Sequence, residues 1–299
     1  MLATAGDIPC NLCGSLDSKT LFEAGKAQAA RIVSCSHCGL MFSSPRARAP
    51  DQDIVKTYDP EVTSRVEETG HDRFEKERLQ TRDYDDSVAY LARLYPQRGK
   101  LLEIGCGMGF LLAKFAQDGW DVLGLEPDKG YCQFIADHHK LKAQPTILEE
   151  SGIAPGSFDA AVMLHVIEHV PDPLSTLRSI FDVLKPGGHL VLETPRYDTL
   201  MFKLLRHRER SLSCDGHIYF FTSDTLKQLT EKAGFRMVKR DYVGRSLSAS
   251  RLLWNLGVMS KSKALQSAFY KLSERLNLDE VRFKLNARDM QRVLLQKPA

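Results

Sequence analysis

Short apolar runs alternate with amphipathic segments through the middle of the chain, which indicates strands and helices that follow one another. The strands are expected at residues 100–105, 120–126, 143–148, 157–166 and 189–195. The intervening helices are expected at residues 110–119, 131–140 and 173–185, the last one ending at a Pro-Gly-Gly stop. This order predicts an α/β fold with a parallel sheet and helices on both faces.

The last third of the chain adds a helix and two further strands. The helix is expected between a threonine–serine cap at residues 222–223 and a glycine stop at Gly234. The strands are expected at residues 235–244 and 289–298. Residues 246–286, between these strands, are amphipathic. They predict a helical insertion that serves as a lid over the substrate face or as a dimer contact.

Composition divides the chain into three parts. Residues 1–48 are punctuated by cysteines and end in the SSPRARAP stretch, which suits a linker. Residues 49–96 are polar and helical in character, and we interpret them as a linker or cap. Residues 97–299 contain the alternating pattern together with the insertion, and they form the main domain.

The 299-residue chain is 43% apolar and 26% charged, which is ordinary for a globular protein and excludes a disordered or fibrous chain. It shows no secretory leader and no apolar run near the roughly 18 residues of a membrane span, so we expect a cytoplasmic protein.

The net charge of +3 conceals a polarity along the chain. Residues 201–299 carry 20 Lys and Arg against 9 Asp and Glu, whereas residues 1–200 carry 21 against 29. The basic end favours an anionic small substrate, a membrane surface with a lipid acceptor, or nucleic acid, unless it is only a solvated helix face.

Two Cys-x-x-Cys-Gly motifs, CNLCG and CSHCG, lie close to the start of the chain. Each motif can place two thiolates on one ion, and the glycine that follows relieves the tight turn. Cys10, Cys13, Cys35 and Cys38 therefore predict a four-cysteine zinc site. A closed site of this kind is structural and takes no part in chemistry.

A glycine loop follows the first strand of the main domain. Gly105, Gly107 and Gly109 alternate behind Glu103 and open a helix, where the backbone can approach a ligand closely. Glu126 ends the next strand, 21 residues after Gly105, where an acid can accept hydrogen bonds from both ribose hydroxyls. The pairing predicts a nucleoside site.

These residues are similar to those of the class I S-adenosylmethionine-dependent methyltransferases. LLEIGCGMG resembles their first motif, LGLEPD the motif with the ribose acid, and FDAAVMLHVIEHVPDP and LKPGGHLVLETP the two that follow. HIYFFTSDTLKQLTEKAGF resembles a late helix and turn, so the resemblance covers about residues 97–245 plus the final strand. It implies a Rossmann-like seven-stranded methyltransferase sheet that binds S-adenosylmethionine.

The resemblance also implies roles for single residues. The three loop glycines line the methionine side of the cofactor, Glu103 lies near its ammonium group, and Glu126 holds the ribose. Ile147 stands where the family often has an acid, which leaves adenine to backbone amides near Leu148 and Glu149. Further residues expected beside the cofactor are Cys106, Pro127, Leu148 and, from the segment before the main domain, Tyr58.

The cysteine segment CNLCG…CSHCGLMFSSPR resembles a zinc-binding module found before methyltransferase domains, including those of sugar C-methyltransferases. Only the two-part architecture is carried over by this resemblance, a small N-terminal zinc ribbon followed by the methyltransferase domain. The substrate is not.

Catalytic groups are expected in a cluster beyond the fourth strand. His165, Glu168 and His169 occupy the loop at its carboxyl end, where open α/β sheets bind substrates, and His217 follows on a later loop of the same face. His169 or His217 is a general base oriented by Glu168, or Glu168, His169 and His217 bind a divalent cation, or the histidines only pack the loop. A histidine in a similar context of related zinc-module sugar methyltransferases favours His217.

The sequence thus predicts a methyltransferase that acts on oxygen of a small molecule such as a sugar, polyketide or quinone. An RNA methyltransferase is one alternative, and a non-catalytic cofactor-binding module recruited through the zinc ribbon is another. The expected partner is a small acceptor, anionic or lipid-linked, and no nucleic acid is expected. Peripheral membrane contact and a homodimer stay open.

Overall fold

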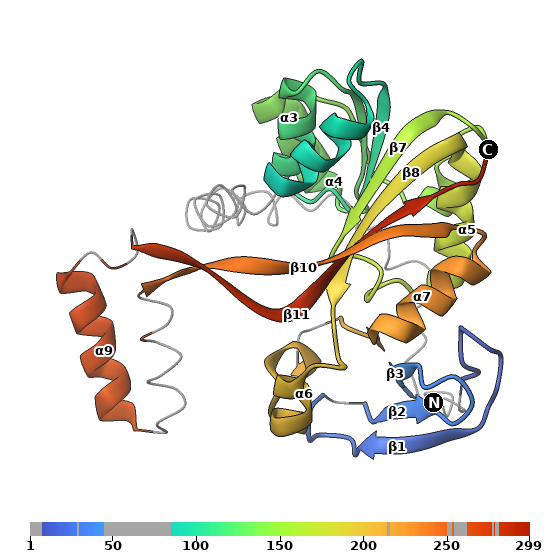
Figure 1. The fold of residues 1–299 in the computed structure, drawn as a ribbon. Coiled ribbons are helices and arrows are strands. Elements are labelled where there is room, and N and C mark those ends of the chain that lie inside the picture. The colour runs from blue at the N-terminus through green and yellow to red at the C-terminus, as the bar shows by residue number, and fades with distance from the viewer. Residues whose placement is uncertain are drawn as a thin grey trace.

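The computed structural model describes residues 8–28, 30–44, 85–213, 216–249, 253, 262–276, 278 and 281–299. These residues form a large seven-stranded sheet flanked by helices, with a small four-stranded sheet at one end (Figure 1). The predicted α/β class, the seven-stranded sheet and the small N-terminal sheet module are confirmed.

The large sheet has the strand order β10-β11-β8-β7-β4-β5-β6. Its strands are β4 (Lys100–Ile104), β5 (Asp121–Leu125), β6 (Ala143–Gln144), β7 (Phe158–Leu164), β8 (Leu184–Pro195), β10 (Arg236–Ser248) and β11 (Arg282–Gln296). The strands from β4 to β8 run parallel to their neighbours, and β11 lies antiparallel between β8 and β10. The chain order reverses between β4 and β7, and ligands of open α/β sheets bind beyond the carboxyl ends of strands at such a point.

Helices cover both faces of this sheet (Figure 1). One face carries residues 85–94, which are helical, with α3 (Phe110–Gln117) and α4 (Lys129–Phe134), which continues in the π-helical turn Ile135–His139. The other face carries α5 (Pro173–Val183) and α7 (Ser223–Lys232). Short 3-10 turns lie at Leu148–Glu150, Arg206–Arg208 and Arg210–Ser213.

The two helices of the second face begin at strong sequence signals. Asp172 caps α5 by accepting from the backbone N–H of Ser175, and Pro173 occupies the first turn. Thr222 and Thr225 exchange hydrogen bonds at the start of α7 in a capping box. These capping hydrogen bonds fix the chain just before each helix, where the candidate catalytic histidines lie.

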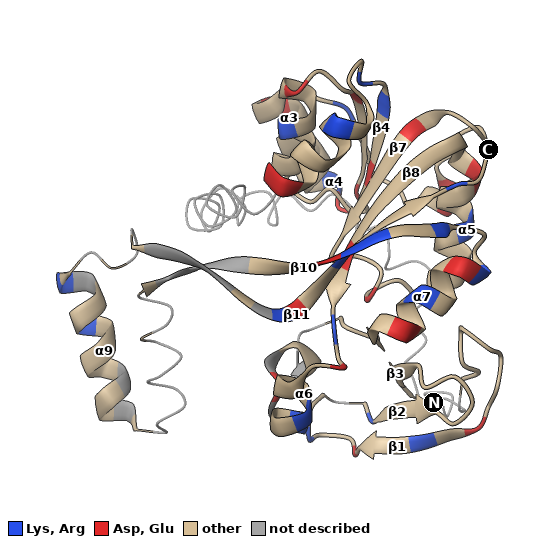
Figure 2. Ribbon diagram, viewed as in Figure 1, with Lys and Arg blue, Asp and Glu red and all other residues tan. Residues whose placement is uncertain are grey.

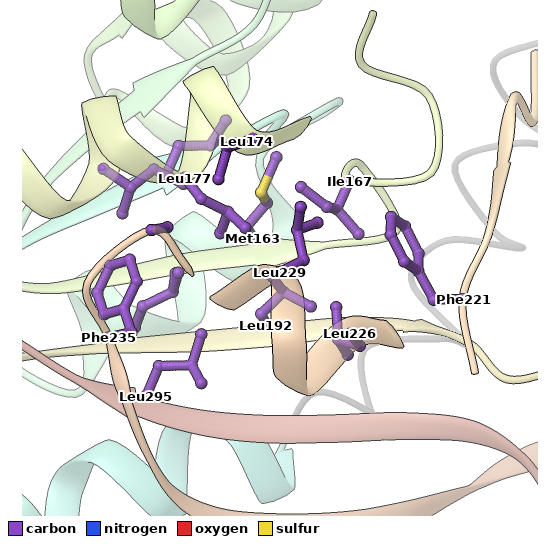
Figure 3. Close-up of a cluster of buried hydrophobic side chains, with 14 of the residues drawn as sticks. Met163, Ile167, Leu174, Leu177, Leu192, Phe221, Leu226, Leu229, Phe235 and Leu295 are labelled. Carbon is purple, nitrogen blue, oxygen red and sulfur yellow. The ribbon is translucent and has the colours of Figure 1, made fainter. Parts of the chain in front are cut away.

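Apolar side chains of α5 and α7 interlock with those of the strands beneath them (Figure 3). Leu177 and Leu229 from the helices meet Met163, Leu192 and Leu295 from β7, β8 and β11, and each is fully buried. Burial of one such side chain contributes about 1.5–3 kcal/mol. This packing makes the carboxyl edge of the sheet a rigid platform.

The small sheet joins the start of the chain to its last third. It consists of β1 (Ser18–Phe22), β2 (Ile32–Cys35), β3 (Met41–Ser43) and β9 (Tyr219–Phe220), in that order. Phe42 of β3 pairs with Tyr219 of β9 in an antiparallel register, and both side chains are buried. The cysteine module therefore shares a sheet with the main domain.

The strands β10 and β11 extend beyond the sheet as a twisted ribbon that carries α9 (Lys263–Arg275) at its far end (Figure 1). Their pairing continues to Ser248 and Arg282, inside the stretch expected to be helical. The two strands satisfy each other's backbone groups there, so the helical part of residues 246–286 is shorter than the amphipathic pattern suggested. None of the described helices is long and apolar enough to cross a bilayer.

Candidate functional site

The glycine loop leads from the carboxyl end of β4 into α3. Gly105 has a φ of 69°, and a Cβ on it would lie 2.3 Å from Cγ2 of Val166. Gly109 has a φ of 76°, and a Cβ there would lie 2.6 Å from Cγ1 of Ile135. Gly107 also has a positive φ, of 52°, yet its Cβ position has nothing within 4 Å. The outer glycines allow the loop to pack against the protein, and the middle one leaves open space above it.

Glu126, directly after β5, is fixed over this loop. Its Oε2 accepts from the backbone N–H of Gly107 at 2.9 Å, and its Oε1 accepts from that of Asp128 at 3.1 Å. Asp128 in turn caps α4 through the N–H groups of Gly130 and Tyr131. An acid at this position, next to the open space at Gly107, can accept hydrogen bonds from the hydroxyls of a ribose.

Glu103 lies in β4 just before the loop and is buried, with 6% of the residue exposed. Its Oε2 has no hydrogen-bond partner among the described residues. Burial, together with the nearby charge of Glu126, raises the pKa of the Glu103 carboxyl well above its usual range. A buried, unpartnered carboxyl of this kind suits a ligand with a cationic group.

These residues fit S-adenosylmethionine, which combines a ribose with an ammonium and a sulfonium group. The open space at Gly107 can admit the methionine portion of the cofactor close to the loop backbone. Glu126 can hold the ribose, and Glu103 can face a cationic group. The remaining predicted cofactor residues differ in burial. Cys106 and Leu148 are buried, Pro127 is half-buried beside Glu126, and Tyr58 lies outside the described residues.

The candidate catalytic cluster begins where β7 ends. His165 has a φ of 58°, an uncommon conformation for a residue other than glycine, and its N–H donates to the carbonyl of Glu193 at 2.9 Å. Glu168 is buried, and its Oε2 accepts from Oγ1 of Thr194 at 2.9 Å. Val166, between them, contacts Gly105, so the cluster adjoins the glycine loop.

His165 lies between two carboxylates. Its Nδ1 is 3.7 Å from Oε1 of Glu168, and its Nε2 is 3.4 Å from Oε1 of Glu193. Burial alone would lower the pKa of His165, but the negative charges of the two nearby glutamates raise it to about 9. Arg292 of β11 approaches Glu193 from the other side, with Nε and Nη2 both 2.9 Å from Oε2. His165 is therefore a cation near neutral pH and not a base.

His217 and His169 complete the cluster on the side of the small sheet. Their ring centroids are 4.6 Å apart, and Nε2 of His217 lies 4.0 Å from Oε1 of Glu168. Burial lowers the pKa of His217, so its imidazole is neutral near pH 7 and can accept a proton. One ligand atom from each of Glu168, His169 and His217 lies within 4.8 Å of the others, so the same residues could also hold a divalent cation.

The loop that carries His217 is attached to the cysteine module. Nε2 of Gln28 donates to the carbonyls of Leu212 and His217 at 2.8 and 3.1 Å, and Oε1 of Gln28 accepts from the hydroxyl of Ser43 at 2.7 Å. On the other side, the N–H of Ile218 donates to the carbonyl of Glu168 at 2.9 Å. The backbone of His217 is thus held by both the cysteine module and the catalytic loop.

The four predicted cysteines converge. Sγ of Cys10 lies 3.4 Å from Sγ of Cys38, the same distance separates Cys13 from Cys35, and all four sulfurs lie within 4.8 Å of one another. Four thiolates around one point are the donor set of a tetrahedral zinc site, which these residues fit. Asn11, inside the first motif, donates to Asp172 at 2.7 Å and so docks the module on the start of α5.

Three residues of this site were not predicted from the sequence. Glu193, Arg292 and Gln28 have no motif of their own. An acid that ends the buried run HLVLETP is a usable signal for Glu193, since a carboxylate next to a core strand requires a partner. Neither Gln28 nor Arg292 has such a signal.

Comparison with known proteins also identifies a methyltransferase domain in this chain. A family model described as a methyltransferase domain matches residues 73–240. The ubiquinone biosynthesis O-methyltransferase of Vibrio parahaemolyticus is 36% identical over 102 residues, which is 32% of this chain and 43% of the relative. That of Ralstonia nicotianae is 36% identical over 107 residues, 33% of this chain and 44% of the relative. The matches thus span less than half the length of these curated relatives.

Solved structures show the same fold at low sequence identity. A SAM-dependent methyltransferase from Archaeoglobus fulgidus has a TM-score of 0.51 at 19% identity, covering 75% of this chain and 99% of that one. The 1,6-didemethyltoxoflavin-N1-methyltransferase of Burkholderia thailandensis has a TM-score of 0.52 at 14% identity, covering 88% and 98%. With the family model matching more than half of its length, the chain belongs to the methyltransferase domain family.

Proposed function

We propose that this chain is an S-adenosylmethionine-dependent methyltransferase that modifies an oxygen atom of a small molecule of the sugar, polyketide or quinone type. One observation carries the proposal. The glycine loop with its two carboxylates and the histidine cluster meet at the switch point of one sheet, where Val166 links them. S-adenosylmethionine, when bound there, supplies an activated methyl group.

On the cofactor side, the residues of the glycine loop and the two carboxylates bind and orient S-adenosylmethionine. The loop backbone and Glu126 hold the ribose and methionine parts, and the Glu103 carboxyl faces the cationic part of the cofactor. Because the pKa of Glu103 is raised, a cationic ligand that favours its carboxylate form would displace a proton from it. Such alignment of the methyl donor is the main requirement of an in-line displacement.

On the acceptor side, a base is needed. Neutral His217 can remove the proton of an acceptor hydroxyl as the oxygen forms its bond to the methyl carbon, and the bond from that carbon to sulfur breaks. Glu168 lies close enough to stabilise the imidazolium that results. Cationic His165 offsets the charges of Glu168 and Glu193, which keeps both buried carboxylates ionised.

The comparisons support oxygen as the acceptor atom. The matching curated relatives are named ubiquinone biosynthesis O-methyltransferases, although only part of each is matched. A neutral histidine beside a carboxylate is suited to a hydroxyl, because a hydroxyl must lose a proton when it is methylated. The surplus of cationic residues in 201–299 favours an anionic acceptor.

A methyl-transfer assay tests the proposal. The purified protein is incubated with S-adenosylmethionine and separate panels of catechols and quinols, sugars, and polyketides, and products are detected by mass spectrometry. We expect S-adenosylhomocysteine together with an acceptor heavier by one methylene. A protein that binds S-adenosylhomocysteine but forms no methylated product from any panel or from a metabolite extract would contradict the proposal.

We further propose that the four cysteines bind one structural zinc ion. Cys38→Ser is expected to reduce the zinc content of the purified protein from one ion per chain to near zero. The midpoint of thermal unfolding should fall by roughly 5–10 °C, because each kcal/mol shifts it by about 2–4 °C in a domain of this size. His37→Ala is the matched control, since His37 lies in the second motif but is exposed and bonded to Asp17. Full zinc content in Cys38→Ser would overturn the assignment.

Gln28 is expected to position the base. Gln28→Glu keeps the size of the side chain but removes the amide that donates to the carbonyls of Leu212 and His217. We expect kcat to fall about tenfold, as removal of one half-buried hydrogen-bond donor costs on the order of 1–2 kcal/mol. The affinity for S-adenosylhomocysteine should be unchanged, whereas the pH profile of kcat should shift with the altered setting of His217.

Gln133→Ala serves as the control for this prediction, because Gln133 of α4 is exposed and its amide donates to Asp137 in the turn that follows α4. Wild-type kcat at every pH in Gln28→Glu would show that the hydrogen bonds from the cysteine module do not affect the function of His217 as a base.

A further inference from the structure

A short helix beside the candidate site exposes most of its large apolar side chains. α6 (Leu200–Leu205) follows β8 and begins with Thr199 as its cap. Leu200 is 72% exposed, Met201 is 50% exposed and Leu204 is 71% exposed. Their spacing of one and four residues places them on one side of the helix. We call these three residues the α6 patch.

The exposure of the α6 patch is not caused by a loose helix. Phe202 fastens α6 to the body, with its ring centroid 5.5 Å from that of Tyr197 and 6.5 Å from that of Phe22. Tyr197 in turn donates its backbone N–H to the carbonyl of Phe221 at 3.0 Å. The helix is thus anchored through the ring of Phe202, while Leu200 and Leu204 are largely exposed. Clustered exposed apolar side chains on an anchored helix mark an interaction surface.

The surroundings of the α6 patch are cationic. Lys203 and Arg206 are exposed, and residues 200–210 contain four Lys and Arg but a single acid. Figure 2 shows the Lys and Arg residues on the ribbon of α6. Long cationic side chains beside exposed leucines are the features of a segment that lies in the headgroup region of an anionic bilayer, with the apolar groups inserted and the cations at the phosphates.

We propose that the α6 patch docks this protein on the surface of a bilayer that contains anionic lipids. The charge decides against a second copy of the chain as the occupant. A two-fold contact would place the patch against itself, so Lys203 and Arg206 would face their own like charges. An anionic headgroup complements the same cations.

The position of the α6 patch adds a functional consequence. α6 begins at Leu200, separated by four residues from the end of β8 at Pro195, and Thr194 of β8 donates a hydrogen bond to Glu168 of the histidine cluster. Docking through α6 therefore brings the acceptor side of the site to the membrane surface, where a lipid-linked acceptor would be presented. The docking itself does not rest on the proposed reaction, and it can be measured without turnover.

Vesicle sedimentation tests the docking. The purified 299-residue chain, loaded with zinc, is mixed with vesicles of equal parts phosphatidylglycerol and phosphatidylcholine, and separately with vesicles of phosphatidylcholine alone. We expect binding to the anionic vesicles that weakens as salt is raised, and little binding to the neutral ones. Leu200→Ser combined with Leu204→Ser should reduce the anionic binding by about tenfold or more, because two inserted leucines are lost.

The matched control replaces the same number of exposed leucines on another helix. Leu265 and Leu272 of α9 are 46% and 42% exposed, and Leu265→Ser combined with Leu272→Ser is expected to bind vesicles like the wild type. Unchanged melting and unchanged affinity for S-adenosylhomocysteine would show that both double variants are folded. Absence of wild-type binding, full binding by the α6 variant, or a wild-type dimer that becomes monomeric only in the α6 variant would overturn the proposal.

Discussion

Gly107→Ala is expected to abolish cofactor binding in a protein that stays folded, whereas Gly105→Ala is expected to destabilise the fold itself. Both glycines have positive φ, which costs an alanine about 1–2 kcal/mol. At Gly105 the added methyl group would also lie 2.3 Å from Val166, and overpacking of this kind costs typically 1–3 kcal/mol more. At Gly107 it would meet no protein atom but would occupy the open space above the loop.

Thermal unfolding and calorimetric titration with S-adenosylhomocysteine separate the two effects. For Gly105→Ala we expect the midpoint to fall by roughly 5–15 °C, given about 2–4 °C per kcal/mol. For Gly107→Ala we expect the midpoint to fall by only roughly 2–8 °C, from backbone strain alone, and the affinity to fall at least about a hundredfold, or about 2.7 kcal/mol. Wild-type affinity in Gly107→Ala would mean that the cofactor does not approach this part of the loop.

The cofactor side of the site could be predicted from the sequence because its parts are local. The glycines follow one strand and Glu126 ends the next, so a correct assignment of two neighbouring parallel strands was enough to bring them together. The four cysteines were predictable for the same reason, since each pair lies within a single turn. In both cases a short spacing determines the geometry, and the long-range fold has only to join two such pieces.

The acceptor side required contacts that no local pattern encodes. Gln28 bonds to the backbone of His217 across 189 positions, and Arg292 reaches Glu193 across 99. The first contact depends on β9 joining the sheet of the cysteine module, and the second on the antiparallel register of β11 with β8. A register shift of one residue would turn Arg292 to the opposite face, so such a pair is determined only once the strands are aligned.

His217→Ala is expected to reduce kcat by about 10²–10⁴-fold, the range that a positioned general base contributes. The affinity for S-adenosylhomocysteine should not change, because His217 lies in the acceptor cluster and not at the glycine loop. Burial lowers the pKa of His217 below the ordinary value of about 6.5. The base must be neutral, so kcat/KM of the wild type should rise with pH through this low pKa and then stay level, while the variant should lack that rise.

The competing role for the same cluster is to hold a divalent cation, and the two roles make different predictions for His169. A cation held by Glu168, His169 and His217 needs all three ligands, so His169→Ala would then be as damaging as His217→Ala. A base at His217 tolerates the loss of its ring neighbour better, and we expect His169→Ala to retain most of the turnover. Dialysis against a weak chelator, with the cysteine-bound zinc verified by analysis, should leave the wild type active. Turnover that is lost on dialysis and restored by Mg²⁺ or Mn²⁺ would instead make His217 a ligand, and its low pKa would then favour metal binding because a ligating imidazole must also be unprotonated.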